Sequence, residues 1–139
     1  MSKNIKVKDS GQRQEYASGA RRDNSSDKGR MDLFPAESLL RLSRWYEWGA
    51  KKYGDHNWER GMPIARYLDA AIRHSLKYLA GCNDEDHLSA AVWNLLCIMY
   101  HEAHQPELQD LPSWKDRKSK WIYPLDYGRE EKEKDDNLS

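Results

Sequence analysis

Residues 84–104 read DEDHLSAAVWNLLCIMYHEAH, and this stretch decides the fold. It opens with three carboxylates and continues with apolar residues at helical spacing, which predicts an α-helix over the range. One stripe of the helix is apolar and is the expected core face, formed by Leu88, Val92, Leu95, Leu96 and Met99. A second stripe carries polar groups seven residues apart, namely His87, Asn94 and His101.

The carboxylates Asp84, Glu85 and Asp86 are expected in the first turn of this helix, where the helix dipole favours anions. Two interpretations of the polar stripe stay open. In the first, the helix is capped and buried, and its histidine and asparagine side chains are hydrogen-bonded by their neighbours. In the second, the stripe lines a polar pocket with the carboxylates at its mouth.

Two further helices are expected earlier in the chain. The first covers residues 35–52, begins at Pro35 and presents a broad apolar face. The second covers residues 63–80 and begins in the same way at Pro63. Proline is favoured in the first turn of a helix because its missing N–H has no partner there.

The second of these helices is joined to residues 84–104 by only a short turn after Gly81. Two helices joined so closely must be antiparallel neighbours. This arrangement predicts that His74 and Lys77 lie close to the acidic start of the last helix.

Residues 53–62 form a loop rich in turn-forming residues. Asn57 and Trp58 on this loop are able to hydrogen-bond to a nucleobase and stack on it. Trp58 is equally suited to close the edge of the hydrophobic core, so both interpretations remain open.

The expected organisation is a small all-α helical bundle of three main helices, followed by an irregular aromatic C-terminal arm. Its parts are a flexible tail (1–18), an all-α domain (19–105), an ordered arm (106–127) and a charged flexible tail (128–139). The arm carries the aromatic anchors Trp114, Trp121, Tyr123 and Tyr127. Three modest helices bury little surface on their own, so a homo-oligomer, a dimer or tetramer, is expected.

The bulk composition excludes several classes of partner. The formal net charge is zero, so no global field attracts nucleic acid or an anionic membrane. We find no signal peptide and no apolar run of membrane-spanning length, and expect a cytoplasmic location. The two cysteines form no disulfide framework, and Cys97 is expected to be a small buried hydrophobic residue.

Acidic and basic side chains recur through the sequence in a combination typical of polyphosphate sites. The carboxylates suit Mg²⁺ or Mn²⁺ and are Glu37, Asp69, Asp84, Glu85 and Asp86. The basic groups that would neutralise phosphates are Lys28, Arg30, Lys52, Arg73 and His74. Taken together, the two sets predict a divalent ion that bridges phosphate oxygens.

A chain of short motifs resembles the small phage and bacterial proteins grouped as dATP/dGTP diphosphohydrolase-type domains. The motifs run in order from about residue 19 to 102: GARRD (19–23), KGRMDLFP (28–35), GAKKYGDHNWERG (49–61), Arg73-His74 and DEDHLSAAVWN (84–94). The resemblance implies an all-α, MazG-like nucleotide pyrophosphohydrolase, in which residues 19–105 would be the nucleotide-binding domain. Such an enzyme would use Mg²⁺ or Mn²⁺ to release pyrophosphate or phosphate from dATP and dGTP. It would act in the cytoplasm, or in the host cytoplasm if a phage encodes it.

The resemblance also implies a role for particular residues. Metal ligands would be Glu37, Asp84, Glu85 and Asp86, and the catalytic groups would be Glu37, Asp86 and His87. Phosphates would be held by Lys28, Arg30, Lys52 and Arg73. The base or sugar would meet Asn57 and Trp58, and the substrate site would include His74 and Asn94. His74 and His87 would support the ligands or carry protons.

The acidic pattern departs from the MazG type, which has an ExxE pair on one helix and an ExxD pair on the next. Leu40 and Arg41 stand where a partner of Glu37 would be, and Ser89 follows Asp86 at the third position. An alternative function therefore stays open, in which the protein binds and sequesters a nucleotide without cleaving it.

Overall fold

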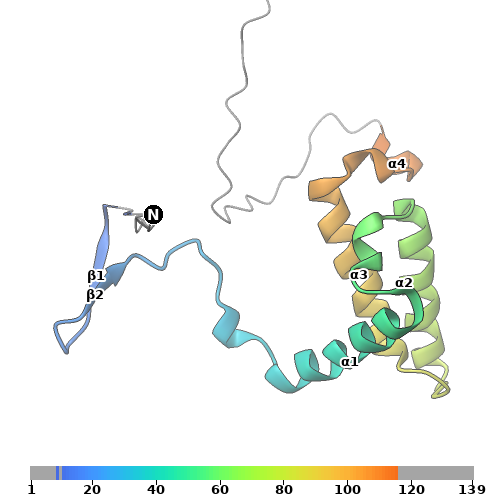
Figure 1. Ribbon diagram of the computed structural model, residues 1–139, viewed down its shortest axis with the longest axis horizontal. Helices are drawn as coiled ribbons and strands as arrows, with labels where there is room; N and C mark the ends of the chain where they lie inside the picture. The colour runs from blue at the N-terminus through green and yellow to red at the C-terminus, as the bar shows by residue number, and fades with distance from the viewer. Residues whose placement is uncertain (1–8, 10, 116–139) are drawn as a thin grey trace, which may run out of the picture. The chain divides into compact units, whose positions relative to one another are not determined.

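The computed structural model describes residue 9 and residues 11–115 of the chain (Figure 1). It divides into two compact units, residues 1–39 and residues 40–139, which we describe separately. In the described residues the three main helices are α1 (Ala36–Tyr53), α2 (Ile64–Leu79) and α3 (His87–His104). The predicted all-α class is therefore confirmed, and each helix begins and ends within a few residues of its predicted range.

The first unit contains a small antiparallel hairpin that no sequence pattern predicted. Strands β1 (Arg13–Glu15) and β2 (Arg21–Asp23) pair with Gln14 opposite Arg22. The turn between them uses Gly19, which has a positive φ and donates its N–H to the carbonyl of Tyr16 at 2.8 Å. The strand residues are charged or polar and almost all exposed, so they lack the alternation that identifies a strand in a sequence. A short 3₁₀ turn, η1 (Met31–Leu33), follows.

The second unit is organised around the antiparallel pair of α2 and α3, which lie side by side (Figure 1). The core of the pair consists of Ile64 and Tyr67 from α2 and Cys97 from α3. Partly buried side chains close its edges, namely Trp58, Trp93, Ile98, Leu108 and Leu111. The expectation that Cys97 is a buried hydrophobic residue is confirmed, and burial raises the pKa of its thiol to about 12.

The prediction of the core face of α3 was wrong. Most of the expected apolar stripe faces outward: Val92, Leu95, Leu96 and Met99 are exposed, whereas Leu88 is half-buried. The polar stripe faces α2 instead, and its residues His87, Asn94 and His101 are buried. Small residues explain the inversion, because Ala90, Ala91 and Cys97 share the buried face and allow α2 to approach closely.

Shorter elements complete the second unit. They are the 3₁₀ turns η2 (Asn57–Arg60) and η3 (Pro106–Leu108) and the short helix α4 (Pro112–Lys115). Asp110, between η3 and α4, accepts a hydrogen bond from the backbone N–H of Ala65 at 2.8 Å and so caps the start of α2. Of the predicted aromatic anchors of the arm, Trp114 is described, whereas Trp121, Tyr123 and Tyr127 lie outside the described residues.

Among the described helices, none combines the length and the hydropathy that crossing a lipid bilayer requires.

Candidate functional site

A cluster of two histidines and two carboxylates forms where α2 meets the turn before α3. His74 lies in α2 and His87 is the first residue of α3. Their Nδ1 atoms are 2.9 Å apart, and His87 Nε2 lies 2.8 Å from a carboxylate oxygen of Asp84. Glu85 Oε2 lies 4.0 Å from His87 Nδ1. The carboxylates Asp84, Glu85 and Asp86 form what we call the acidic turn. The prediction that the antiparallel pair brings His74 to this turn is confirmed.

The hydrogen bonds fix which ring nitrogens carry protons when both histidines are neutral. A carboxylate can only accept, so His87 Nε2–H donates to Asp84. His87 Nδ1 then accepts from His74 Nδ1–H, an assignment made from the network. His87 is 2% exposed, so its orientation is held by packing as well as by these bonds.

The protonation equilibria of the cluster follow from these contacts. Burial lowers the pKa of His74, which favours its neutral form. The pKa of the Asp84 carboxyl is also below its ordinary value, chiefly because it accepts the bond from His87. The charge of Lys77 adds a smaller effect in the same direction, which agrees with the prediction that Lys77 lies close to this turn.

The start of α3 differs from the prediction, because none of the three carboxylates lies inside the first turn. Asp86 is the N-cap residue, and its side chain accepts hydrogen bonds from Ser89 N at 3.2 Å and Ser89 Oγ at 2.7 Å. It also forms a bidentate ion pair with Arg41 of α1, at 2.6 and 2.9 Å. Arg41 therefore holds α1 against the start of α3, and the pKa of Asp86 falls to about 2, chiefly through this pair.

Replacing Asp86 with alanine is expected to destabilise the protein by about 1–2 kcal/mol, since it removes the cap and the partner of Arg41. The folded-state pKa of about 2 lies below the ordinary value of 3.8 for an aspartate side chain, so Asp86 stabilises the fold above pH 4. This contribution is lost as the pH falls from about 4 to 2. Urea unfolding followed by circular dichroism at several pH values should show a smaller acid-induced loss in Asp86→Ala than in wild type. An equal loss in both proteins would contradict the assignment.

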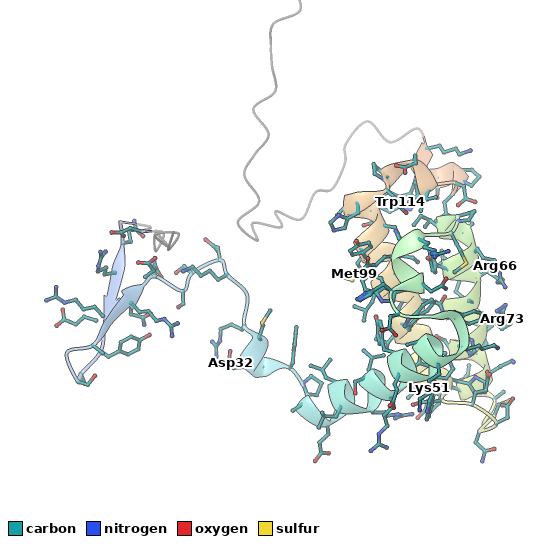
Figure 2. All side chains as sticks on the ribbon, viewed as in Figure 1. Asp32, Lys51, Arg66, Arg73, Met99 and Trp114 are labelled. Carbon is teal, nitrogen blue, oxygen red and sulfur yellow. The ribbon has the colours of Figure 1, made fainter. Side chains whose placement is uncertain are left out.

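The predicted phosphate-binding residues of the second unit lie on the exposed surface. Arg73 and Arg66 lie on the outer side of α2, and both pair with Asp69, at 2.9 and 3.0 Å (Figure 2). Lys52 is exposed at the end of α1, with its ammonium 5.2 Å from the centre of the Tyr53 ring.

A shallow groove of about 500 Å³ runs along the outer face of α2. Its lining residues are Asp69, Ile72, Arg73, Leu76, Lys77, Ala80 and Cys82. Helical periodicity places His74 on a different face of α2. The groove therefore offers basic groups near the cluster, but it does not contain the histidines.

Three other predicted residues belong to the first unit. Arg30 pairs with Asp32 at 2.7 Å, Lys28 donates its backbone N–H to Ser25, and Glu37 lies in the first turn of α1. These residues belong to a unit separate from the acidic turn, so their role beside it stays a prediction.

Trp58 packs at the edge of the core. Its ring makes edge-to-face contacts with Tyr100 and Tyr46, with centroids 4.9 and 6.3 Å away. Its carbonyl oxygen accepts a hydrogen bond from His101 Nε2 at 2.9 Å. This geometry favours the core-closing interpretation of Trp58 over base stacking. The preceding residue, Asn57, begins η2 and is half-buried.

Asn94, the remaining predicted substrate contact, is buried and donates its amide to the carbonyl of Ala90 at 2.8 Å. This bond lies within α3 and agrees with the interpretation of a buried, internally hydrogen-bonded polar stripe.

Sequence reasoning missed the roles of Arg41 and Ser89. In the sequence, Arg41 stands out only because it occupies a position where the MazG pattern has an acidic residue. Its partner in the structure, Asp86, is 45 residues away. The spacing of Asp86 and Ser89 is compatible with an N-cap, and this local signal could have placed the helix start at His87.

Comparisons with known proteins identify the family. The sequence profile described as "dATP/dGTP diphosphohydrolase, N-terminal" matches residues 18–111. No curated protein and no solved structure gives a significant match. The matched range contains both histidines of the cluster, the acidic turn and all three main helices, and the chain belongs to the dATP/dGTP diphosphohydrolase N-terminal family.

Proposed function

We propose that this protein hydrolyses purine deoxynucleoside triphosphates, dATP and dGTP, in a reaction that depends on Mg²⁺ or Mn²⁺ and releases pyrophosphate or phosphate. The family match over residues 18–111 is the observation that carries the proposal. The geometry supports it in one respect, because Asp84, Glu85 and the histidine pair lie together at one end of the α2–α3 pair, where Lys77 is near enough to act on Asp84.

The acidic turn fits Mg²⁺ in part. The side chains of Asp84 and Glu85 are 70% and 50% exposed and offer the oxygen ligands that Mg²⁺ prefers. Asp86 fits less well, because its carboxylate is already bonded to Arg41 and Ser89. We therefore assign the ion to Asp84 and Glu85. When bound, it would neutralise charge on the phosphates and polarise them.

The protein side chains would supply binding and proton transfer. Arg73 and Lys77 line the groove on the outer face of α2 and would neutralise phosphate charge. Arg73 would then leave its ion pair with Asp69 for the phosphate. His74 is hydrogen-bonded to His87, and His87 is hydrogen-bonded to Asp84. If His74 takes up a proton, these bonds would transmit the stabilising effect of the Asp84 carboxylate to it.

A second candidate function is nucleotide binding without cleavage. It is favoured by the engagement of Asp86, since a third carboxylate held by Arg41 leaves fewer ligands for an ion. Such a protein would sequester dATP or dGTP.

Product analysis separates the two candidates. The protein is incubated with dATP, dGTP, dCTP, dTTP and the ribonucleotides in the presence of Mg²⁺, and the products are resolved by anion-exchange chromatography. Conversion of dATP and dGTP supports the proposed enzyme. A purine nucleotide that raises the melting temperature but is not consumed supports sequestration. The absence of both effects would overturn both candidates.

We also infer that the outward-facing stripe of α3 is the interface with a second copy of the chain. Among residue 9 and residues 11–115, only seven apolar side chains are buried, which is a small core for the chain. The exposed stripe, Val92, Leu95, Leu96 and Met99, lies opposite the buried face and contains no charged residue. A two-fold axis would pack this stripe of one copy against the same stripe of the second copy and so extend the core. Figure 2 labels Met99, one member of the stripe.

Placing a charge in the stripe is expected to dissociate the oligomer. Size-exclusion chromatography with light scattering should show a multiple of 16.4 kDa for wild type and a clear shift toward 16.4 kDa for Leu95→Glu with Met99→Glu. Met31→Glu, which alters an exposed apolar residue of the first unit, should leave the mass unchanged. A wild-type protein that stays monomeric at all concentrations would contradict the inference.

A further inference from the structure

We propose that His74, His87 and Glu85 form a binding site for a divalent transition-metal ion of the Zn²⁺ type, which would compete for Glu85 with the Mg²⁺ expected with the nucleotide and would replace the bond between the two histidines. One ligand atom from each residue lies within 4.8 Å of the others. Imidazole nitrogen suits Zn²⁺, Co²⁺ and Ni²⁺, whereas Mg²⁺ prefers oxygen.

The separation of the two imidazole nitrogens matches shared coordination. Two nitrogens bound to one tetrahedral Zn²⁺ at 2.0–2.1 Å lie about 3.3 Å apart. The Nδ1 atoms of His74 and His87 are 2.9 Å apart, so a small movement of the half-buried His74 would admit an ion in place of the hydrogen bond. Glu85 is exposed and free to turn its carboxylate toward the same point, 4.0 Å from His87 Nδ1 in the present geometry.

Asp84 supplies the support that metal-binding histidines usually have. It accepts the Nε2–H of His87 at 2.8 Å, which fixes the tautomer in which Nδ1 carries a lone pair. That lone pair faces His74 and Glu85, the two other ligands of the proposed site. A carboxylate, a histidine and an ion in this order are a recurrent arrangement in zinc proteins.

The proposed site has three protein ligands and therefore leaves a fourth position for water or a substrate oxygen. Zinc sites with an open position are typical of catalysis, whereas structural sites are closed by four protein ligands. Ion binding itself does not rest on the proposed nucleotide hydrolysis, because it can be measured without any nucleotide.

Titration with the metal alone tests the proposal. The full chain carrying Cys82→Ser, which removes an exposed competing thiol, is stripped with chelator and titrated with Zn²⁺ by calorimetry and with Co²⁺ by visible absorption. We expect one ion per chain and an intense tetrahedral Co²⁺ spectrum. Mg²⁺ at the same concentration should give no comparable signal.

Variants assign the ligands. His74→Ala and Glu85→Gln change half-buried and exposed residues and should weaken Zn²⁺ binding at least 10-fold while leaving the far-ultraviolet dichroism unchanged. Asp84→Asn should weaken it by about 10- to 100-fold through the loss of support for His87. His56→Asn, which alters an exposed histidine of the loop before η2, is the matched control. Absence of Zn²⁺ binding, or binding unaffected by His74→Ala and Glu85→Gln, would overturn the proposal whatever the outcome of the nucleotide assays.

Discussion

Gly61→Ala is expected to destabilise the protein by about 2–4 kcal/mol, the largest stability effect of any single glycine substitution in the described chain. Gly61 follows η2 with a φ of +86°, a conformation that alanine adopts only with strain. A β-carbon at this position would also collide with Gln105 Oε1 and Leu108 Cδ1 and would lie 3.2 Å from His101 Cε1. Because His101 holds the Trp58 carbonyl, the collision would disturb the hydrogen bond that fixes the loop to α3.

Gly81→Ala is the matched control for this effect. Gly81 has nearly the same φ, +82°, but a β-carbon there meets nothing within 4 Å. The Gly81→Ala substitution should therefore lower the free energy of unfolding only by the backbone strain, about 1 kcal/mol. Chemical denaturation followed by circular dichroism gives both free energies of unfolding. Equal losses in the two variants would show that Gly61 is not closely packed.

The helices and their pairing were predictable because their signals are local. The prolines immediately before α1 and α2, the glycine after α2 and the apolar spacing located all three main helices. The short turn between α2 and α3 then fixed their antiparallel arrangement and brought His74 to the acidic turn.

The orientation of α3 was not predictable from periodicity alone. Periodicity separates two stripes, but it does not say which one meets α2. In this protein the close approach of two helices selects the stripe with Ala90, Ala91 and Cys97. Each of its polar members makes a hydrogen bond: His87 to His74 of α2, Asn94 within α3, and His101 Nε2 to the Trp58 carbonyl, whereas His101 Nδ1 is buried without a partner among the described residues. The small residues on the same face as Asn94, namely Ala90, Ala91 and Cys97, were the feature of the sequence that could have indicated the buried face.

Tertiary ion pairs lay beyond the sequence for a different reason. Arg41 and Asp86 are 45 residues apart, and neither has a local pattern that identifies the other. The same limit applies to the candidate site, since the distances among His74, His87 and Asp84 come from the packing of α2 against the turn before α3.

Removing both exposed carboxylates of the acidic turn is expected to abolish nucleotide hydrolysis. Asp84→Asn with Glu85→Gln removes the two side chains assigned to the Mg²⁺ ion and leaves Asp86, the N-cap of α3, and its pair with Arg41 in place. The loss of rate should be on the order of 100-fold or more, since the charge that develops on the phosphates is no longer neutralised. The fold should persist, because both carboxylates are largely exposed.

The initial rate of dATP hydrolysis, measured against Mg²⁺ concentration, tests the central claim that the acidic turn beside the histidine pair is the reaction site. The comparison is between wild type, Asp84→Asn with Glu85→Gln, and the control Glu47→Gln with Glu102→Gln, which removes the same charge from exposed positions elsewhere. We predict saturable activity in wild type and in the control, and a rate at least 100-fold lower in the acidic-turn variant. Activity in the acidic-turn variant equal to that of the control would contradict the claim and place the reaction site elsewhere in the chain.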